Sequence, residues 1–180
     1  MALLSDAEIQ QRARAIRCLF LDIDGVMTDC KLYLGPDGFE IKAVSVRDGL
    51  GIKNLLRAGI EVAVISGRPS EAMQRRLEHL GVPHIVLATE NKLPAYEALL
   101  QRLGLSDDEC AMMGDDTPDL PLMRRVGLAL TVADAHRTAM QAAHWVSAFR
   151  GGEGAVREAS DLILDAQGRS DATLSVDMAG

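Results

Sequence analysis

Two aspartates, Asp22 and Asp24, follow the apolar segment CLFL and are separated by one residue. Ionised carboxylates cost several kcal/mol to bury without partners, so something must hold this pair at the end of a buried segment. Other polar side chains follow later apolar segments: Ser66 in ISGRPS, Lys92 in NKL and Asp115 in GDDTPD. Carboxylates, a hydroxyl and an ammonium form a set that can bind a cation together with a phosphoryl group.

These side chains also suggest a reaction. Asp22 and Asp115 would offer carboxylates and Asp24 a backbone carbonyl to Mg²⁺, which prefers oxygen ligands. No His or Cys clusters with them, which disfavours zinc. Asp22 can attack phosphorus as a nucleophile, and Asp24 can protonate the leaving oxygen and then activate a water. Ser66 and Lys92 would stabilise the charge on the transferred phosphoryl oxygens. The predicted chemistry is phosphoryl transfer through an aspartyl-phosphate.

Two more acids, Asp116 and Asp119, lie in the same GDDTPD segment. Acidic residues are favoured at the start of any helix, so their presence alone does not identify a function. Two interpretations therefore stay open. Asp116 and Asp119 either cap the helix that follows, or they hold the metal site and Lys92 in position without touching the substrate.

Short apolar segments alternate along the chain with amphipathic segments. The predicted strands are 18–22, 60–67, 84–88, 109–116, 128–132 and 144–147, and the predicted helices are 48–59, 69–81, 91–104, 119–127, 134–143 and 153–168. Strands that are apolar on both faces and alternate with helices indicate a three-layer, Rossmann-like α/β fold with a parallel sheet. Ligands bind such sheets at the carboxyl ends of the strands, where the polar set lies.

One segment breaks this alternation. Residues 30–46 alternate in polarity around GPDG, which predicts a β-hairpin flap beside Asp22 and Asp24. No insertion is long enough for a cap domain, so residues 1–180 are expected to form one domain. An N-terminal helix is expected within residues 1–16, with Ser5 and Glu8 as a capping box. The small and polar residues 169–180 are expected to form a mobile tail.

Composition narrows the function further. The 180 residues are 48% hydrophobic and 25% charged, with a net charge of −7. This charge disfavours nucleic acids and membranes as partners but allows a phosphorylated substrate at a local cationic cluster. No apolar run is long enough to span a membrane, and the N-terminus lacks the features of a signal peptide. The three scattered cysteines, Cys18, Cys30 and Cys110, indicate a reducing compartment, so we expect a cytoplasmic protein.

The motifs resemble a known superfamily. DIDGVMTD, SGR, Lys92 and GDDTPD are similar to the four ordered motifs of the haloacid dehalogenase (HAD) phosphatases. VSVRDGLGIKNL, GRPSEAMQRR and GGEGAVREASDLILDAQG resemble the family of 3-deoxy-D-manno-octulosonate (KDO) 8-phosphate phosphatases, and the likeness extends from Arg17 to Gly168. It implies a core without a cap, Mg²⁺, and hydrolysis of KDO 8-phosphate in lipopolysaccharide precursor synthesis. It also implies a homotetramer in which hairpins and neighbouring subunits enclose the active site.

The resemblance also assigns residues. It implies that Asp22 is the nucleophile and Asp24 the acid/base, and that Asp22, the Asp24 carbonyl and Asp115 hold the metal. The implied substrate contacts are Asp24, Ser45, Val46, Arg47, Asp48, Gly49, Lys53, Arg68, Arg76 and Lys92. Arginine is suited to the planar carboxylate of a sugar acid through its bidentate fork. Arg75 and Arg76 are adjacent in a predicted helix and cannot face the same way, and the resemblance selects Arg76.

Three departures from the family pattern leave the substrate open. Cys30 stands where these proteins usually have Gly, and Leu87 and Ala88 stand where a Gln-Gly pair is common. Glu153 occupies a position often held by Arg. The chain also resembles phosphatases of a nine-carbon sugar acid 9-phosphate (KDN or sialic type). Arg68 favours the eight-carbon substrate, because Glu follows the Gly of this motif in the nine-carbon relatives.

Two other classes of protein share part of this pattern. Receiver-type signalling domains also combine an acidic cluster, a hydroxyl and a lysine, but their phosphorylated Asp follows a later strand. Here the first strand carries an Asp with an acid two residues on, which favours turnover over a stable phosphate. A non-catalytic assembly domain is the other alternative, and the complete set of Asp22, Asp24, Lys92 and Asp115 disfavours it.

Overall fold

Six parallel strands form the central sheet of the computed structural model, which describes residues 4–36 and 39–170. The strand order is β5-β4-β1-β6-β7-β8. The strands are β1 (Cys18–Leu21), β4 (Glu61–Ile65), β5 (His84–Val86), β6 (Cys110–Met113), β7 (Leu128–Thr131) and β8 (Trp145–Val146). Leu21 pairs with Val64 on one side and with Met113 on the other, so β1, β4 and β6 end at the same level. The residues that follow these three strands therefore meet at one edge.

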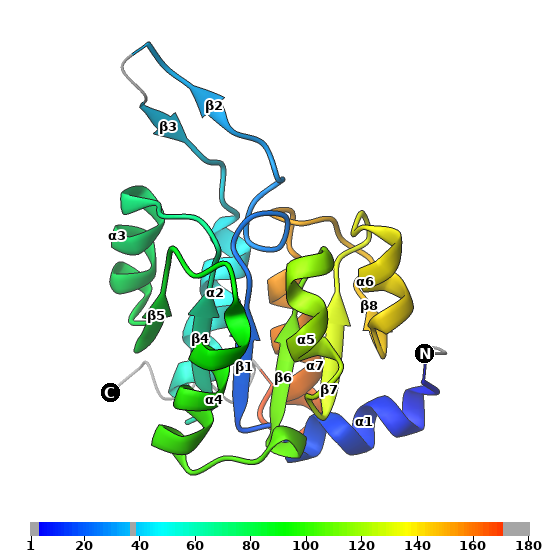
Figure 1. Cartoon of the computed structure of the whole chain (residues 1–180). Helices are drawn as coiled ribbons and strands as arrows, with labels where there is room; N and C mark the ends of the chain where they lie inside the picture. The colour runs from blue at the N-terminus through cyan, green and yellow to red at the C-terminus, as the bar shows by residue number, and fades with distance from the viewer. Residues whose placement is uncertain (1–3, 37–38, 171–180) are drawn as a thin grey trace, which may run out of the picture.

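Helices cover both faces of the sheet, with α2 and α7 behind it and α4 and α5 in front of it in Figure 1. The helices are α1 (Asp6–Ala15), α2 (Val46–Arg57), α3 (Glu71–Leu80), α4 (Lys92–Leu103), α5 (Leu120–Met123), α6 (Arg137–Ala142) and α7 (Ala155–Ala166), with short 3₁₀ turns η1 (Asp107–Glu109) and η2 (Thr117–Asp119). The sheet is buried between these layers: every residue of β1, β6 and β7 is buried. The predicted parallel, three-layer α/β architecture is confirmed.

The ends of the helices follow local capping rules. Ser70 and Gly81 bound α3 as predicted, and the Ser5 capping box is present at α1. The helix predicted from residue 48 instead begins at Val46, because Ser45 Oγ accepts hydrogen bonds from the first free backbone amides of α2. The helix predicted from residue 134 begins at Arg137, after a cap by the preceding histidine.

The predicted hairpin projects beyond the carboxyl edge of the sheet, at the top of Figure 1. Its strands, β2 (Tyr33–Leu34) and β3 (Glu40–Ile41), pair antiparallel. The turn residues 37–38 and the segment 171–180 of the predicted mobile tail lie outside the described residues. Within the described ranges no cap domain follows β1. None of the helices described is long and apolar enough to cross a membrane.

Candidate active site

A pocket of about 460 Å³ lies at the carboxyl edge of the sheet, where β1, β4 and β6 end at the same level. Four segments that are distant in the sequence contribute to its walls. Its lining residues are Asp22, Asp24, Cys30, Ser66, Gly67, Arg68, Glu90, Lys92, Asp115, Asp116, Pro118 and Asp119. The structure thus brings together the acids, the hydroxyl and the lysine that the sequence singled out.

Lys92 stands between two carboxylates at the bottom of this pocket. Its Nζ lies 2.7 Å from Asp22 Oδ1 and 2.6 Å from Asp119 Oδ1, and its side chain is only 2% exposed. Burial alone would lower the pKa of Lys92, but the charges of Asp22 and Asp119 outweigh it and raise the pKa. Lys92 is therefore a permanent cation at the start of α4, where it can face a phosphoryl oxygen.

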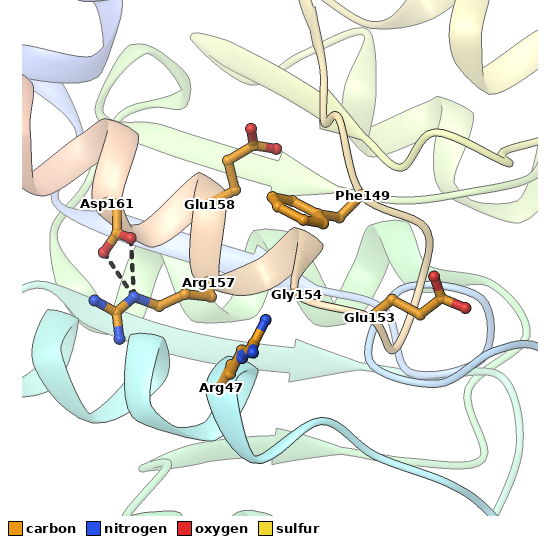
Figure 2. A pocket seen from close by; sticks show the side chains of 7 residues that line it. All are labelled: Arg47, Phe149, Glu153, Gly154, Arg157, Glu158 and Asp161. Atoms are coloured by element: carbon orange, nitrogen blue, oxygen red, sulfur yellow. Dashed lines mark hydrogen bonds and ion pairs between the residues drawn. The ribbon is translucent and has the colours of Figure 1, made fainter.

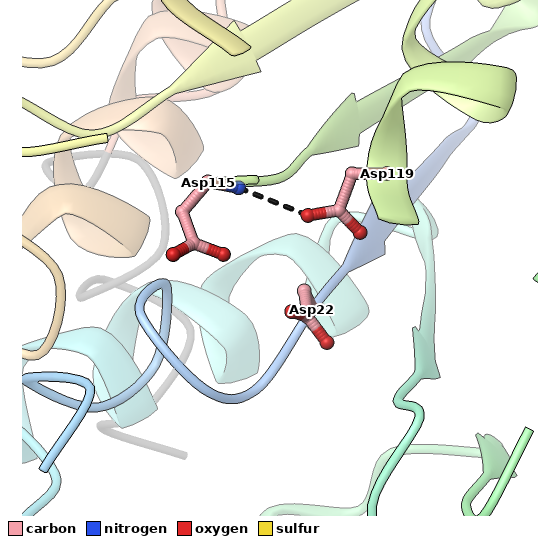
Figure 3. A group of neighbouring side chains, drawn as sticks. All are labelled: Asp22, Asp115 and Asp119. Atoms are coloured by element: carbon pink, nitrogen blue, oxygen red, sulfur yellow. Dashed lines mark hydrogen bonds between the residues drawn. The ribbon is translucent and has the colours of Figure 1, made fainter. Parts of the chain in front are cut away.

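Asp115 and Asp119 belong to one short segment but have different partners. Oδ2 of Asp119 accepts a hydrogen bond of 3.0 Å from the backbone N–H of Asp115, as Figure 3 shows. The Asp115 carboxylate instead lies against Gly25, where an added Cβ would be 2.0 Å from Asp115 Oδ2. Gly25 also has φ +91°, so only glycine fits at this position. Asp115 is thereby directed at the end of β1.

The carboxylates of Asp22, Asp115 and Asp119 repel one another and are buried or partly buried. Burial, followed by the charges of Asp22, Asp119 and Asp116, raises the pKa of Asp115 to about 8. Burial and Asp119 likewise raise the pKa of Asp22, although Lys92 opposes the shift. One lysine does not neutralise this group of carboxylates, so a further positive charge would stabilise it.

The donor atoms fit a hard divalent cation. Single oxygens of Asp22, Asp115 and Asp119 lie within 4.8 Å of one another, and the group contains no His or Cys. Asp22 Oδ1 is buried without an aligned hydrogen-bond donor among the described residues, although Lys92 forms its ion pair there. Both oxygens of Asp119 are already engaged, by Lys92 and by backbone amides. Asp22 and Asp115 are therefore the carboxylates best placed to hold Mg²⁺.

Asp24 points toward a second cation, Lys42, from the hairpin. Lys42 Nζ lies 2.7 Å from Asp24 Oδ1 and 3.0 Å from its Oδ2. Arg68 approaches from the loop after β4, with its Nε 3.8 Å from Asp24 Oδ2. The same arginine lies 3.5 Å from Glu40 of β3. The Asp24 carboxylate thus lies in the same pocket as Asp22 and Lys92 and is paired with cations from the hairpin and from the loop after β4.

Ser66 and Asp116 occupy the remaining parts of the pocket. Ser66 is buried directly after β4, and its Oγ accepts a hydrogen bond from the backbone N–H of Arg68. Asp116 caps η2 through the N–H of Thr117 and lies 3.5 Å from His136. Between the two interpretations of the acids, the contacts of Asp116 match a cap, whereas Asp119 contacts Lys92 directly.

The SVRDG segment lies outside this pocket. Asp48 is buried, and its Oδ1 accepts a 2.8 Å hydrogen bond from the N–H of Arg157 at the start of α7. Arg47 lines a different pocket, of about 390 Å³, with residues of α7 and the loop before it. Figure 2 shows Arg47 and Arg157 on facing elements, with Arg157 paired to Asp161. Ser45 caps α2, and Val46 is exposed.

The predicted substrate contacts on α2 and α3 are also outside the pocket. Arg76 lies against Gly49, where an added Cβ would be 2.6 Å from its Nη2. Arg75 faces solvent and pairs with Glu71. Lys53 is half-buried within α2. Of the predicted substrate contacts, all of which are described residues, only Asp24, Arg68 and Lys92 line the catalytic pocket.

Two of the residues that depart from the family pattern have an unusual backbone conformation. Among the described residues, Cys30 and Ala88 are the only non-glycine residues with positive φ, at +61° and +58°. Both stand where the resembling family usually has Gly, the residue that adopts this region without strain. Cys30 lines the catalytic pocket, whereas Glu153 lines the second pocket with Arg47.

Sequence reasoning missed three residues at or beside the pocket. Glu90 lines it, while Glu40 and Lys42 contact Arg68 and Asp24 from the hairpin. A signal for the latter two was present, because Glu40 and Lys42 alternate with an apolar residue and must share one face of the hairpin. No comparable pattern marks Glu90.

Comparisons with known proteins agree with this geometry. A family model described as haloacid dehalogenase-like hydrolase matches residues 84–158. The 3-deoxy-D-manno-octulosonate 8-phosphate phosphatase KdsC of Escherichia coli (strain B / BL21-DE3) is 44% identical over 165 residues, which cover 92% of this chain and 88% of the relative. The Yersinia pestis protein of the same name is 46% identical over 160 residues, or 89% of this chain and 86% of the relative.

Solved structures are similar over the same length. The Yersinia pestis phosphatase superposes with a TM-score of 0.89 at 45% identity, covering 90% of this chain and 88% of that chain. The phosphatase of Moraxella catarrhalis, solved in complex with magnesium ion, phosphate ion and KDO, has a TM-score of 0.91 at 37% identity, covering 94% and 98%. The fold, the pocket and these likenesses show that this chain belongs to the 3-deoxy-D-manno-octulosonate 8-phosphate phosphatase family of haloacid dehalogenase-like hydrolases.

Proposed function

We propose that this protein is a Mg²⁺-dependent phosphomonoesterase that hydrolyses KDO 8-phosphate to KDO and inorganic phosphate. The observation that carries the proposal is the placement of Asp22 between Lys92 and Asp115 in one pocket. The Moraxella catarrhalis relative, which holds magnesium, phosphate and KDO, supports the same substrate class. A long-lived phosphoacceptor or a non-catalytic assembly domain would not need an acid two residues after its nucleophile.

The first half of the reaction transfers the phosphoryl group to Asp22. An oxygen of the Asp22 carboxylate attacks phosphorus, and the bond from phosphorus to the sugar oxygen breaks. Asp24 gives its proton to the departing oxygen. Lys92 and Ser66 face the phosphoryl oxygens, where their positive charge and hydroxyl dipole stabilise the transition state. Mg²⁺, held by Asp22, the Asp24 carbonyl and Asp115, would neutralise charge on the acids and the phosphate.

The second half restores the enzyme. Asp24, now ionised, takes a proton from a water that attacks phosphorus, and the bond between phosphorus and Asp22 breaks. Inorganic phosphate leaves, and Asp22 and Asp24 return to their starting states. Asp119 stays paired with Lys92 throughout and holds this lysine toward Asp22.

For substrate recognition we propose Arg68 as the residue that selects the eight-carbon acid. It lines the pocket, and its side chain is 54% exposed. A guanidinium at the pocket mouth can form a bidentate pair with the sugar carboxylate. The other predicted contacts are Ser45, Val46, Arg47, Asp48, Gly49, Lys53 and Arg76. They would have to meet a substrate bound in a neighbouring subunit.

We further propose a homotetramer assembled through the hairpin. Tyr33, Leu34, Phe39 and Ile41 are large apolar side chains, and each is more than half exposed. Large apolar side chains that are exposed together on one short hairpin are typical of an interface between protein chains. We keep the predicted cytoplasmic location, in line with three free cysteines in the described chain.

Phosphate release from a panel of substrates tests the proposal. The panel contains KDO 8-phosphate, the nine-carbon sugar acid 9-phosphate and simple hexose phosphates, each with Mg²⁺ and with EDTA. The expected result is Mg²⁺-dependent release with a strong preference for KDO 8-phosphate. Preference for the nine-carbon acid would overturn the substrate, and no release from any compound would overturn the enzymatic function.

A further inference from the structure

Asp24 has a buried cationic partner that the mechanism above does not use. Lys42 follows β3 at the base of the hairpin, and its side chain is only 2% exposed. Its Nζ reaches both oxygens of the Asp24 carboxylate, at 2.7 Å and 3.0 Å. A lysine is almost never buried unless it is paired, so this contact fixes the position of both side chains.

The hairpin directs Lys42 at Asp24 by its strand geometry. Side chains two residues apart in an extended segment lie on the same face, so Glu40 and Lys42 share the face of the hairpin that contacts Arg68 and Asp24. Ile41, between them, faces the other way and is 53% exposed. Lys42 also lies 3.5 Å from Glu40, which keeps the two on one surface.

Glu40 connects the same face of the hairpin to the loop after β4. Its carboxylate accepts a hydrogen bond of 3.2 Å from Ser70, the cap of α3, and lies 3.5 Å from Arg68. Two acids, Asp24 and Glu40, therefore share two cations, Lys42 and Arg68. Of the two cations, Arg68 is the exposed one and is 3.8 Å from Asp24, so it does not replace Lys42.

We propose that Lys42 is a positioning residue: it holds the Asp24 carboxylate in the orientation from which Asp24 transfers protons to and from the reacting oxygens. Among the described residues Lys42 forms ion pairs with Asp24 and Glu40 and none with Asp22 or Asp115, so its direct partner at the reacting centre is the acid/base. The inference rests on the proposed phosphatase function, and it makes the hairpin a working part of the catalytic site.

Kinetics of three variants test this role. Lys42→Met removes the charge but keeps the length of the side chain, Lys42→Arg keeps the charge, and Lys31→Met is the matched control. Lys31 lies on the other arm of the hairpin and pairs with Asp29 at the surface, and it forms no ion pair with Asp24 among the described residues. All three are compared with the wild type at saturating Mg²⁺, with folding and oligomeric state checked in parallel.

The expected result is a fall in kcat of about tenfold to a hundredfold for Lys42→Met, with little change in KM, as for other residues that orient a reacting group. Lys42→Arg should recover most of this loss, and Lys31→Met should match the wild type. Single-turnover release of the leaving group gives the sharper readout. The loss should be larger for a sugar phosphate than for p-nitrophenyl phosphate, whose leaving group needs no proton.

Two kinetic results would overturn the proposal. One is an unchanged kcat in Lys42→Met; the other is an equal loss on both leaving groups that arginine does not rescue, which indicates a structural role alone. A crystal structure of Lys42→Met gives a test that needs no activity, because an unchanged Asp24 side-chain conformation would also refute the inference. Failure of the proposed function looks different: wild-type protein would then release no phosphate from KDO 8-phosphate.

Discussion

Asp22 and Lys92 meet at 2.7 Å although one follows β1 and the other begins α4. The parallel sheet makes this contact possible, because β1, β4 and β5 all end at its carboxyl edge. Asp22 follows β1, and Lys92 follows the loop after β5. Asp119 holds the lysine from the opposite side at 2.6 Å. The arrangement keeps a cation beside the nucleophile while leaving Asp115 free to complete a metal site.

The metal-free protein should lose stability as the pH rises. The pKa of Asp115 is raised from its ordinary value of 3.8 to about 8, so the folded state holds a proton that the unfolded state releases. This contribution to stability is complete below about pH 4 and is lost progressively up to about pH 8. Thermal unfolding in EDTA at several pH values measures it.

Asp115→Asn provides the comparison, because the amide does not titrate. In EDTA the stability of the wild type should fall relative to that of Asp115→Asn as the pH rises from about 4 to about 8, the window between the ordinary and the raised pKa of Asp115. Added Mg²⁺ should stabilise the wild type most at the upper end, where the acids are ionised. A gap between the two proteins that stays constant with pH would contradict the raised pKa.

Arg68→Ala should weaken substrate binding more than catalysis. A hydrogen-bonded ion pair with the sugar carboxylate contributes about 1.5–3 kcal/mol, so KM for KDO 8-phosphate should rise roughly tenfold to a hundredfold. Steady-state kinetics measure it, with Arg75→Ala as the control because Arg75 faces solvent and pairs with Glu71. Equal effects of the two substitutions would remove Arg68 from the substrate contacts.

Leu34→Asp should dissociate the proposed tetramer. Leu34 is 72% exposed in the single chain, and an acid there would place a charge in the interface that the hairpin is proposed to form. Light scattering after size-exclusion chromatography gives the mass directly. The control is Ala98→Asp, an exposed position on α4 away from the hairpin, and a tetramer that survives Leu34→Asp would place the interface elsewhere.

Ala88→Gly and Cys30→Gly should each stabilise the protein. Both residues have φ near +60°, where a side chain costs about 1–2 kcal/mol relative to glycine. Part of this gain is offset by the greater freedom of glycine in the unfolded chain, so we expect about 0.5–1 kcal/mol. Denaturant unfolding measures the gain. Ala98→Gly, within the exposed part of α4, should change stability in the opposite direction.

The sheet, its layers and the polar residues of the catalytic pocket could be predicted from the sequence, because each depends on the local pattern of apolar and polar residues. Asp22, Ser66 and Asp115 follow apolar strands, and a parallel sheet must bring such positions to one edge. The surroundings of Arg47, Asp48 and Arg76 depend instead on how α2 packs against α7 and α3, which no local pattern records. For the same reason Asp48, expected to contact substrate, is found bonded to the start of α7.

The Lys42–Asp24 pair could not be predicted from the sequence pattern alone. The hairpin and its position beside Asp24 were predicted, and the alternation of Glu40, Ile41 and Lys42 was visible in the sequence. Which face of a hairpin meets the protein depends on the path of the chain between Asp24 and β2. Only the folded structure supplies that path.

Phosphate release by Asp22→Asn tests the central claim most directly. The amide keeps the size of the side chain but cannot serve as the carboxylate nucleophile, so turnover should fall by at least about a thousandfold. Asp6→Asn is the control, since Asp6 is exposed at the start of α1 and does not line the catalytic pocket. The account predicts an inactive, folded Asp22→Asn protein beside a fully active control. Normal turnover by Asp22→Asn would show that phosphoryl transfer does not pass through this residue.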